Sequence, residues 1–251
     1  MLRKLLRIAL ITLLSGIALS VLLVLSLRWI NPPVSALLLE RQVSAKLAGH
    51  SYDSKLQWTP WAALPDHLKM AVIAAEDQQF ANHHGFDIAA IQAALVHNQS
   101  STSSIRGAST ISQQVAKNVF LWSSRSWPRK ALEAWFTLLI ELLWSKERIL
   151  EVYLNIAEWG PGIFGAEAAA EYHFQTGAPY LSNQQAYLLA AILPSPLTRS
   201  LQPPSAATLQ RARWISRQVQ QLGAGHYLNK LKQQPAWTTK LRETIEDILS
   251  F

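Results

Sequence analysis

The chain of 251 residues contains no cysteine. Disulfide bonds, thiolate metal sites and a thiol nucleophile are therefore excluded. Charged residues are also scarce, at 16% of the chain, against roughly 25% in a typical soluble domain. Glycine and proline, with 10 and 12 residues, are too few for a collagen-like or low-complexity chain. Apolar residues are abundant at 49%, which excludes a disordered chain and allows a sizeable core.

Basic residues outnumber acidic ones by 23 to 16, and the net charge is +7. Such a balance is typical of proteins that bind nucleic acid, anionic membranes or phosphate-bearing ligands. Residues 1–28 hold four basic side chains and no acidic one, namely Arg3, Lys4, Arg7 and Arg28. Residues 88–132 hold five basic side chains and no acidic one: Arg106, Lys117, Arg125, Arg129 and Lys130. Aromatic residues are sparse in this second segment, which argues against nucleic acid as a partner.

A run of 20 residues without a charge, Ile8–Leu27, follows the first basic cluster. As a helix it would be roughly 30 Å long, which matches the hydrocarbon thickness of a bilayer. A cleaved signal peptide would have a shorter apolar region and small residues at its cleavage site. We therefore expect a cytoplasmic tail over residues 1–7 and a transmembrane anchor over residues 8–30. The rest is expected outside the cytoplasm, an orientation that charge counting alone does not fix.

Residues 31–251 show helical spacing of apolar side chains and no sustained alternation of the kind found in strands. We expect one mainly α-helical domain. The expected helices cover residues 65–80, 87–95, 109–120, 128–154, 164–173, 183–193, 206–222 and 238–249. The serine-rich stretch 98–106 is expected to form a loop.

Residues 76–87 read EDQQFANHHGFD. Glu76 ends an apolar helical run, where a carboxylate can acquire a raised pKa and act as a general acid or base. An ordinary helix terminus with solvated charges is the alternative, and the residues alone leave both open. His83 and His84 are expected to cap or pack, because adjacent side chains rarely converge on one metal ion.

Two further segments carry polar groups suited to a sugar–phosphate ligand. Residues 107–118 read GASTISQQVAKN. The small residues at its start allow a ligand to approach the backbone closely, and the residues after them supply hydroxyl, amide and lysine groups. Residues 125–135 read RSWPRKALEAW, in which Glu133 lies four residues after Arg129 and three after Lys130. Solvated helix faces and structural salt bridges are the alternatives, although charge-assisted donors are also what phosphate oxygens prefer.

Taken in series, these segments resemble the peptidoglycan glycosyltransferases of family 51, the glycosyltransferase domain of penicillin-binding proteins. EDQQFANHHGFD resembles the first motif, GASTISQQVAKN the second, RKALE the third and KERILEVYLN the fourth. EWGPGIFGAEAAAEYHF and YLLAAILPSP follow in the family's order. Ser112 stands where threonine is more usual, and His173 interrupts a usual aromatic pair. The resemblance covers about residues 60–205.

This resemblance implies a lysozyme-like helical domain that polymerises lipid II with inversion and releases undecaprenyl pyrophosphate. Neither Ser-x-x-Lys nor Lys-Thr-Gly occurs in the chain, so we expect a monofunctional enzyme without a transpeptidase domain. The expected location is the bacterial inner membrane, with one span and the catalytic domain on the periplasmic side. The expected partners are lipid II, the growing glycan chain and the membrane. Other cell-wall synthesis or division proteins remain open as partners, and nucleic acid is not expected.

The resemblance also assigns roles to residues. It makes Glu76 the catalytic general base and gives Glu133 a catalytic role in orienting nearby cations or a divalent ion. It assigns substrate binding to Asp77, Phe80, His83, Gly85, Ser109, Thr110, Gln113, Gln114, Lys117, Asn118, Arg125, Arg129 and Lys130. No covalently bound cofactor is expected; Mg or Mn is compatible with the resemblance, and its ligands are not assigned.

Two other functions are compatible with the residues. A lysozyme-like enzyme that cleaves peptidoglycan would use Glu76 and Glu133 as its two carboxylates. A non-catalytic scaffold of the cell-wall machinery would need no acid–base carboxylate at all. The cationic segment favours the polymerising enzyme, since a glycosidase has no pyrophosphate to bind.

Overall fold

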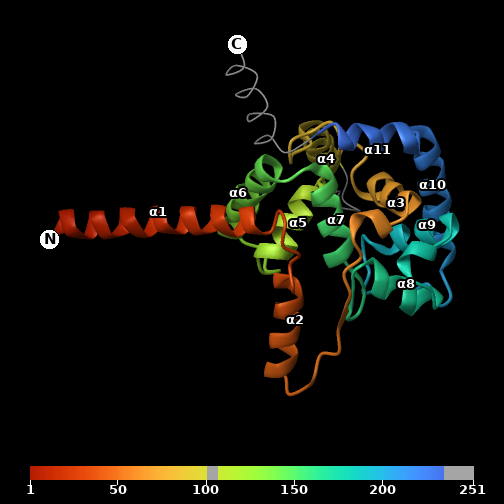
Figure 1. Ribbon diagram of the computed structural model, residues 1–251, viewed down its shortest axis with the longest axis horizontal. Coiled ribbons are helices and arrows are strands. Elements are labelled where there is room, and N and C mark those ends of the chain that lie inside the picture. The colour runs from red at the N-terminus through yellow and green to blue at the C-terminus, as the bar shows by residue number, and fades with distance from the viewer. Residues whose placement is uncertain (101–106, 235–251) are drawn as a thin grey trace, which may run out of the picture.

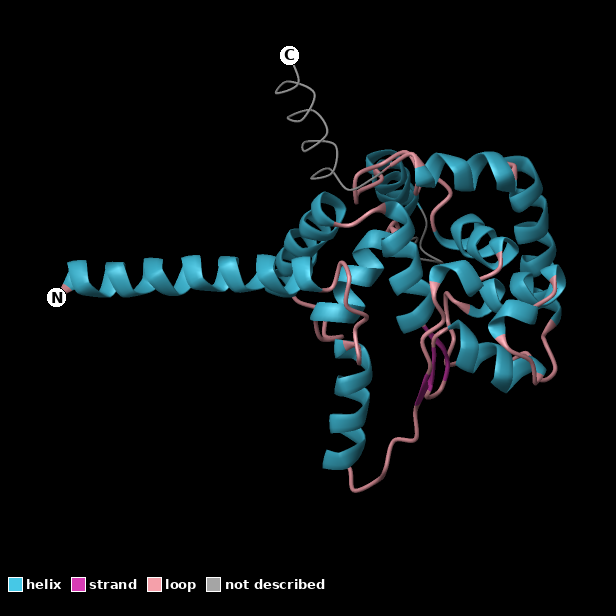
Figure 2. Cartoon of the chain, viewed as in Figure 1, coloured by secondary structure: helices cyan, strands magenta, loops and turns pink. Residues whose placement is uncertain are grey.

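The computed structural model describes residues 1–100 and 107–234, and helices dominate this part of the chain (Figures 1 and 2). The expectation of a mainly α-helical protein is confirmed. In chain order the α-helices are α1 (Leu2–Ser26), α2 (Ala36–Leu47), α3 (Asp66–Glu76), α4 (Ile88–Ser100), α5 (Ile111–Phe120), α6 (Trp127–Leu143), α7 (Lys146–Ile156), α8 (Ala166–Phe174), α9 (Asn183–Ile192), α10 (Ala206–Leu222) and α11 (Ala224–Lys232). Two short 3-10 helices are η1 (Trp61–Ala63) and η2 (Ala178–Tyr180).

Helix α1 projects from the body of the molecule (Figure 1) and is long and apolar enough to cross a membrane over Arg3–Ser26. Its last turns contact the folded domain. The indole Nε1 of Trp144 donates to the carbonyl oxygen of Val24 at 2.8 Å, and that of Trp135 donates to the hydroxyl of Ser20 at 3.1 Å. The helix is therefore exposed along its N-terminal part and fixed to α6 and the residue that follows it at its C-terminal end.

The core lies where α3 packs against α9 and α10, and where α5 packs against α6 and α7. Helix α3 is buried on all sides from Leu68 to Ala74, where every residue is at most 4% exposed, whereas Asp66 in its first turn is exposed. A helix buried all round needs apolar residues all round, and this one reads MAVIAA over its last turns before Glu76. The buried helix carries Glu76 at its C-terminal end and so fixes that residue relative to α5, α9 and α10.

The expected helix over residues 128–154 is wrong in one respect, because the structure has two helices there, α6 and α7. The break falls at Trp144 and Ser145. Trp144 is 1% exposed, and the hydroxyl of Ser145 accepts a hydrogen bond from the backbone N–H of Arg148 at 3.2 Å. A serine N-cap supplies an acceptor for a free N–H group and starts a new helix.

Short strands also occur, which the sequence pattern did not reveal. They are β1 (Lys55–Leu56), β2 (Glu158–Gly160) and β3 (Ile163–Phe164), in the order β1-β3-β2. β3 pairs parallel with β1 and antiparallel with β2. Strands of two or three residues are too short to show an alternating pattern.

The remaining boundaries differ by a few residues. The expected helix over 65–80 ends at Glu76, because Asp77 leaves the helical conformation with φ −160°. Helix α4 continues through Ser100, where a loop was expected to have begun. The rest of that loop and the expected helix over 238–249 lie outside the described residues.

Candidate active site

The N-terminus of α5 is fixed by a capping box. The hydroxyl of Thr110 accepts from the backbone N–H of Gln113 at 3.2 Å, and the Gln113 side chain accepts from the backbone N–H of Thr110 at 3.1 Å. The same hydroxyl donates to the carbonyl oxygen of Gly85 at 2.7 Å. These bonds satisfy the free end of the helix and set its orientation. Gln113 is thus used in the cap, and Gln114 and Lys117 line the neighbouring cavity.

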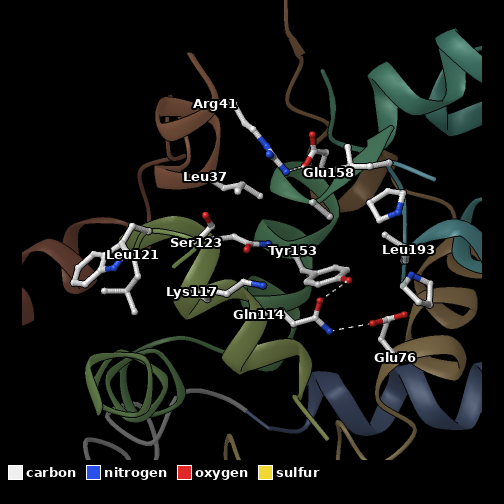
Figure 3. Close-up of a pocket in the computed structure, with 16 residues that line it drawn as sticks. Leu37, Arg41, Glu76, Gln114, Lys117, Leu121, Ser123, Tyr153, Glu158 and Leu193 are labelled. Atoms are coloured by element: carbon white, nitrogen blue, oxygen red, sulfur yellow. Dashed lines mark hydrogen bonds and ion pairs between the residues drawn. The ribbon is translucent and has the colours of Figure 1, made fainter. Parts of the chain in front are cut away.

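Glu76 is hydrogen-bonded to Gln114, which also contacts Tyr153 (Figure 3). Gln114 donates from Nε2 to Oε2 of Glu76 at 3.0 Å and accepts from the Tyr153 hydroxyl at 3.3 Å. The guanidinium of Arg211 lies 4.0 Å from Oε1 of Glu76. Burial raises the pKa of Glu76, and the Gln114 hydrogen bond and the Arg211 charge only partly oppose this effect. A carboxylate with a raised pKa and a fixed orientation is suited to general acid–base chemistry.

Two cavities meet at Glu76. The first, here called the α5 cavity, has a volume of about 400 Å³, and Glu76, Gln114, Lys117, Asn118 and Tyr153 contribute to its wall. The second, here called the α10 cavity, has a volume of about 780 Å³, and Glu76, Ser109, Thr110, Arg211 and Trp214 contribute to its wall. Glu76 and Pro194 line both. Ligands on either side would therefore share one carboxylate.

The cations next to the α5 cavity form a partly buried group. Burial lowers the pKa of Lys117, while the nearby Glu133 carboxylate raises it. Glu133 is 3% exposed and accepts from Arg129 at 2.6 Å and from Lys130. Arg125 is exposed between α5 and α6. Lys117 thus lines the α5 cavity itself, and Glu133 holds two cations together without lining either cavity.

Asp77, the neighbour of Glu76, has internal partners. Both of its carboxylate oxygens lie 3.0 Å from Nε2 of His83, and Oδ2 also accepts from the backbone N–H of Ile111 at 3.0 Å. Asp77 therefore connects the end of α3 to the start of α5. It borders the α10 cavity while being only 7% exposed.

Phe80, His83 and Gly85 lie in the packing behind the cavity walls. Phe80 is fully buried, with Nζ of Lys146 placed 4.5 Å from its ring centroid. Gly85 has φ +91°, and a Cβ at this position would lie 2.7 Å from Cγ2 of Thr137. The structure does not bring these three residues to either cavity, and their expected contact with substrate stays a prediction.

Sequence reasoning missed several residues that the structure places at the site. Tyr153 lies within the fourth motif and reaches Gln114, although the motif alone does not reveal its direction. Arg211 lies far along the chain, on α10. That helix contains three arginines and no acidic residue, which is the sequence feature that could have indicated an anion-binding role. Arg41 of α2 also lines the α5 cavity, where it pairs with Glu158 at 3.2 Å (Figure 3).

Comparisons with known proteins match most of this chain. The transglycosylase family model matches residues 41–220. A biosynthetic peptidoglycan transglycosylase of Ectopseudomonas mendocina is 65% identical over 219 residues, which cover 87% of this chain and 90% of the relative. One of Stutzerimonas stutzeri is 63% identical over 222 residues, which cover 88% and 91%. One of Pseudomonas aeruginosa is 59% identical over 232 residues, which cover 92% and 100%.

The matched segment contains all the motif residues from Glu76 to Lys130 and also Arg211. It covers more than half of the chain, and the similar relatives align over most of their own length. This chain belongs to the transglycosylase family.

Proposed function

We propose that this protein polymerises lipid II into glycan strands, with inversion at the anomeric carbon and release of undecaprenyl pyrophosphate. The observation that carries the proposal is the position of Glu76 between two cavities. A polymerising enzyme must hold a glycan donor and a lipid II acceptor together, with one base between them. The family and the names of the relatives support this reaction.

Glu76 is the proposed general base. The acceptor's 4-hydroxyl attacks the donor's anomeric carbon while its proton passes to a carboxylate oxygen of Glu76. The raised pKa of Glu76 brings its basicity closer to that needed near neutral pH. The hydrogen bond from Gln114 holds one oxygen in place, which leaves the other oxygen to face the acceptor.

Lys117 is the proposed direct contact of the leaving pyrophosphate. Negative charge builds on that group as the glycosidic bond breaks, and a preorganised cation stabilises such a transition state. Arg125, Arg129 and Lys130 are proposed to extend the positive field. Glu133 then acts as a positioning residue, because it already binds Arg129 and Lys130.

Hydrogen bonds to sugar and phosphate groups are proposed for Ser109, Gln114 and Asn118. Asn118 supports this directly, because its Oδ1 atom is buried without a hydrogen-bond partner in the described part of the chain. A buried acceptor left unpaired costs free energy, so a sugar hydroxyl donated to it would stabilise the complex. Thr110 and Gln113 are already paired in the capping box and are proposed to act by fixing α5.

Helix α1 is proposed to anchor the enzyme in the bacterial inner membrane, with the helical domain on the periplasmic side. Its length and apolar composition support the span. An anchored enzyme meets its lipid-linked substrate in the plane of the membrane. Other cell-wall synthesis or division proteins are proposed partners on the same surface.

No covalent cofactor is proposed, and Mg or Mn is proposed to assist at the pyrophosphate. Within residues 1–100 and 107–234, no three histidine, aspartate or glutamate side chains are grouped as a protein metal site would need. A divalent ion would then be held mainly by the pyrophosphate itself, as Mg²⁺ commonly is. Polymerisation rates with and without a chelator test this point.

The main experiment incubates the purified full chain with lipid II and, separately, with finished glycan strands. Growth of polymer from lipid II supports the proposal. Cleavage of finished strands without polymer growth would instead indicate a lysozyme-like hydrolase and overturn it. The position of Glu133 argues against the hydrolase, because that carboxylate binds two cations and does not line either cavity.

A further inference from the structure

The C-terminal part of the described chain is basic, and no acidic residue there balances its positive charge. Residues 172–234 contain six basic side chains and no acidic one: Arg199, Arg211, Arg213, Arg217, Lys230 and Lys232. Helix α10 alone contributes three of these arginines within 17 residues. These charges belong neither to the membrane anchor nor to the segment proposed to bind pyrophosphate.

Three of these arginines surround a third cavity, here called the arginine cavity. Its volume is about 380 Å³, and its wall includes Arg199, Gln210, Arg211, Trp214 and Arg217. Arg211 and Trp214 also line the α10 cavity. The arginine cavity is therefore next to the α10 cavity, which has Glu76 in its own wall.

Two of the three arginines are held in place, and donors remain free on both. Arg199 donates from Nη1 to the carbonyl oxygen of Ala191 at 2.6 Å, which fixes the side chain against α9. Arg211 lies over the ring of Trp214 at 5.8 Å, and its Nε is buried without a hydrogen-bond partner among the described residues. Among the described residues neither Arg199 nor Arg217 forms an ion pair, so both are available for an anionic ligand.

We propose that the arginine cavity binds carboxylates of the peptide stem on a saccharide held in the α10 cavity. This inference rests on the proposed function. The stem is a pentapeptide attached to the sugar and carries at least a C-terminal carboxylate, so it enters the site with the saccharide. Arginine binds carboxylates through paired N–H donors, which gives orientation as well as charge. The substrate's pyrophosphate is proposed to lie by Lys117, in the other cavity.

The test compares two forms of lipid II as substrates of the full chain. One has free carboxylates on its stem, and in the other every stem carboxylate is converted to an amide. The variants are Arg199→Gln, Arg217→Gln and the two combined. Arg213→Gln is the matched control, because Arg213 is exposed on the same helix and does not line the arginine cavity.

For the wild type we expect a lower KM for the acidic stem than for the amidated one. Each single variant should raise the KM for the acidic stem by roughly threefold, the size expected for a partly exposed ion pair, and the double variant by roughly tenfold. The KM for the amidated stem should stay unchanged. Both kcat values should also stay unchanged at a pH well above the pKa of Glu76, whose carboxylate form Arg199 helps to stabilise. The wild-type preference should also weaken at high ionic strength, since salt screens exposed charges.

Other outcomes overturn the inference in distinguishable ways. Equal wild-type KM values for the two stems would refute stem binding while leaving polymerisation intact. An equal rise in KM for both stems would assign the arginines to a part of lipid II that the two forms share, such as its sugars or its pyrophosphate. An effect of Arg213→Gln as large as that of Arg217→Gln would show that surface charge alone is responsible. Failure of the wild type to polymerise either substrate would instead refute the proposed function.

Discussion

A buried ion pair behind the active site allows a quantitative test of the packing. Lys146 and Glu141 lie 2.8 Å apart, with side chains 4% and 6% exposed. Lys146 also donates to the carbonyl oxygen of His83 at 2.7 Å, and Glu141 accepts from the hydroxyl of Ser112. The pair thus connects the first, second and fourth motifs in the interior.

The perturbation is Lys146→Met, which removes one charge and leaves Glu141 buried without its cation. Breaking a buried pair in this way costs about 3–5 kcal/mol of unfolding free energy. For a protein of this size each 1 kcal/mol lowers Tm by roughly 2–4 °C, so we expect a fall of roughly 6–20 °C. Burial lowers the pKa of Lys146 in spite of the nearby Glu141, which agrees with a pair whose removal as a whole costs little.

A second variant separates the lost charge from lost packing. Lys146→Met combined with Glu141→Gln removes both charges and keeps a side-chain oxygen for Ser112. We expect it to recover more than half of the lost unfolding free energy, because replacing both members of a buried pair is often nearly neutral. Thermal and urea unfolding in detergent, followed by circular dichroism, measure both variants. A loss below about 1 kcal/mol for Lys146→Met, or no recovery in the double variant, would refute the reasoning.

Three further outcomes follow from the site. In the wild type the Gln114 hydrogen bond favours the carboxylate form of Glu76 and lowers its pKa. Gln114→Leu removes that bond, so the pKa should rise and the acidic limb of the kcat–pH profile should move to higher pH; an unmoved limb contradicts this. Thr110→Ala should lower the unfolding free energy by about 1–2 kcal/mol in a denaturant titration, since it removes the α5 cap; no change would mean that the capping box contributes little. Lys117→Ala should reduce lipid II turnover roughly 100-fold with Tm unchanged, and retained turnover would remove Lys117 from the pyrophosphate contact.

The sequence predicts the long, strongly patterned elements well. The uncharged run before Arg28 forms most of α1, and the apolar run before Glu76 forms the buried turns of a helix that ends at that carboxylate. Both succeed because hydrophobic patterning over several turns determines the structure. The break at Ser145 escaped prediction because the apolar stripe continues across it. The two helices are separated by extended backbone at Trp144 and Ser145, together with the N-cap hydrogen bond of Ser145 and the burial of Trp144.

The site is predicted in part for a similar reason. Three site residues lie in short motifs, and their side-chain types indicate acid–base or hydrogen-bonding chemistry: Glu76, Gln114 and Lys117. The structure brings all three to one cavity. Asp77 has the same type of side chain as Glu76, yet tertiary contacts with His83 turn it inward. Arg211 reaches Glu76 from 135 residues further along the chain, and neither local pattern nor spacing encodes such a long-range contact.

The central claim is that Glu76 accepts the proton of the attacking hydroxyl. Glu76→Gln keeps an oxygen to accept the Gln114 hydrogen bond, so the fold and Tm should be unchanged while the basic carboxylate is lost. The most direct measurement is the initial rate of lipid II polymerisation by this variant in parallel with the wild type. A loss of at least about 100-fold is predicted, within the usual contribution of a general base. A rate close to that of the wild type, from a variant that is folded normally, would contradict the account.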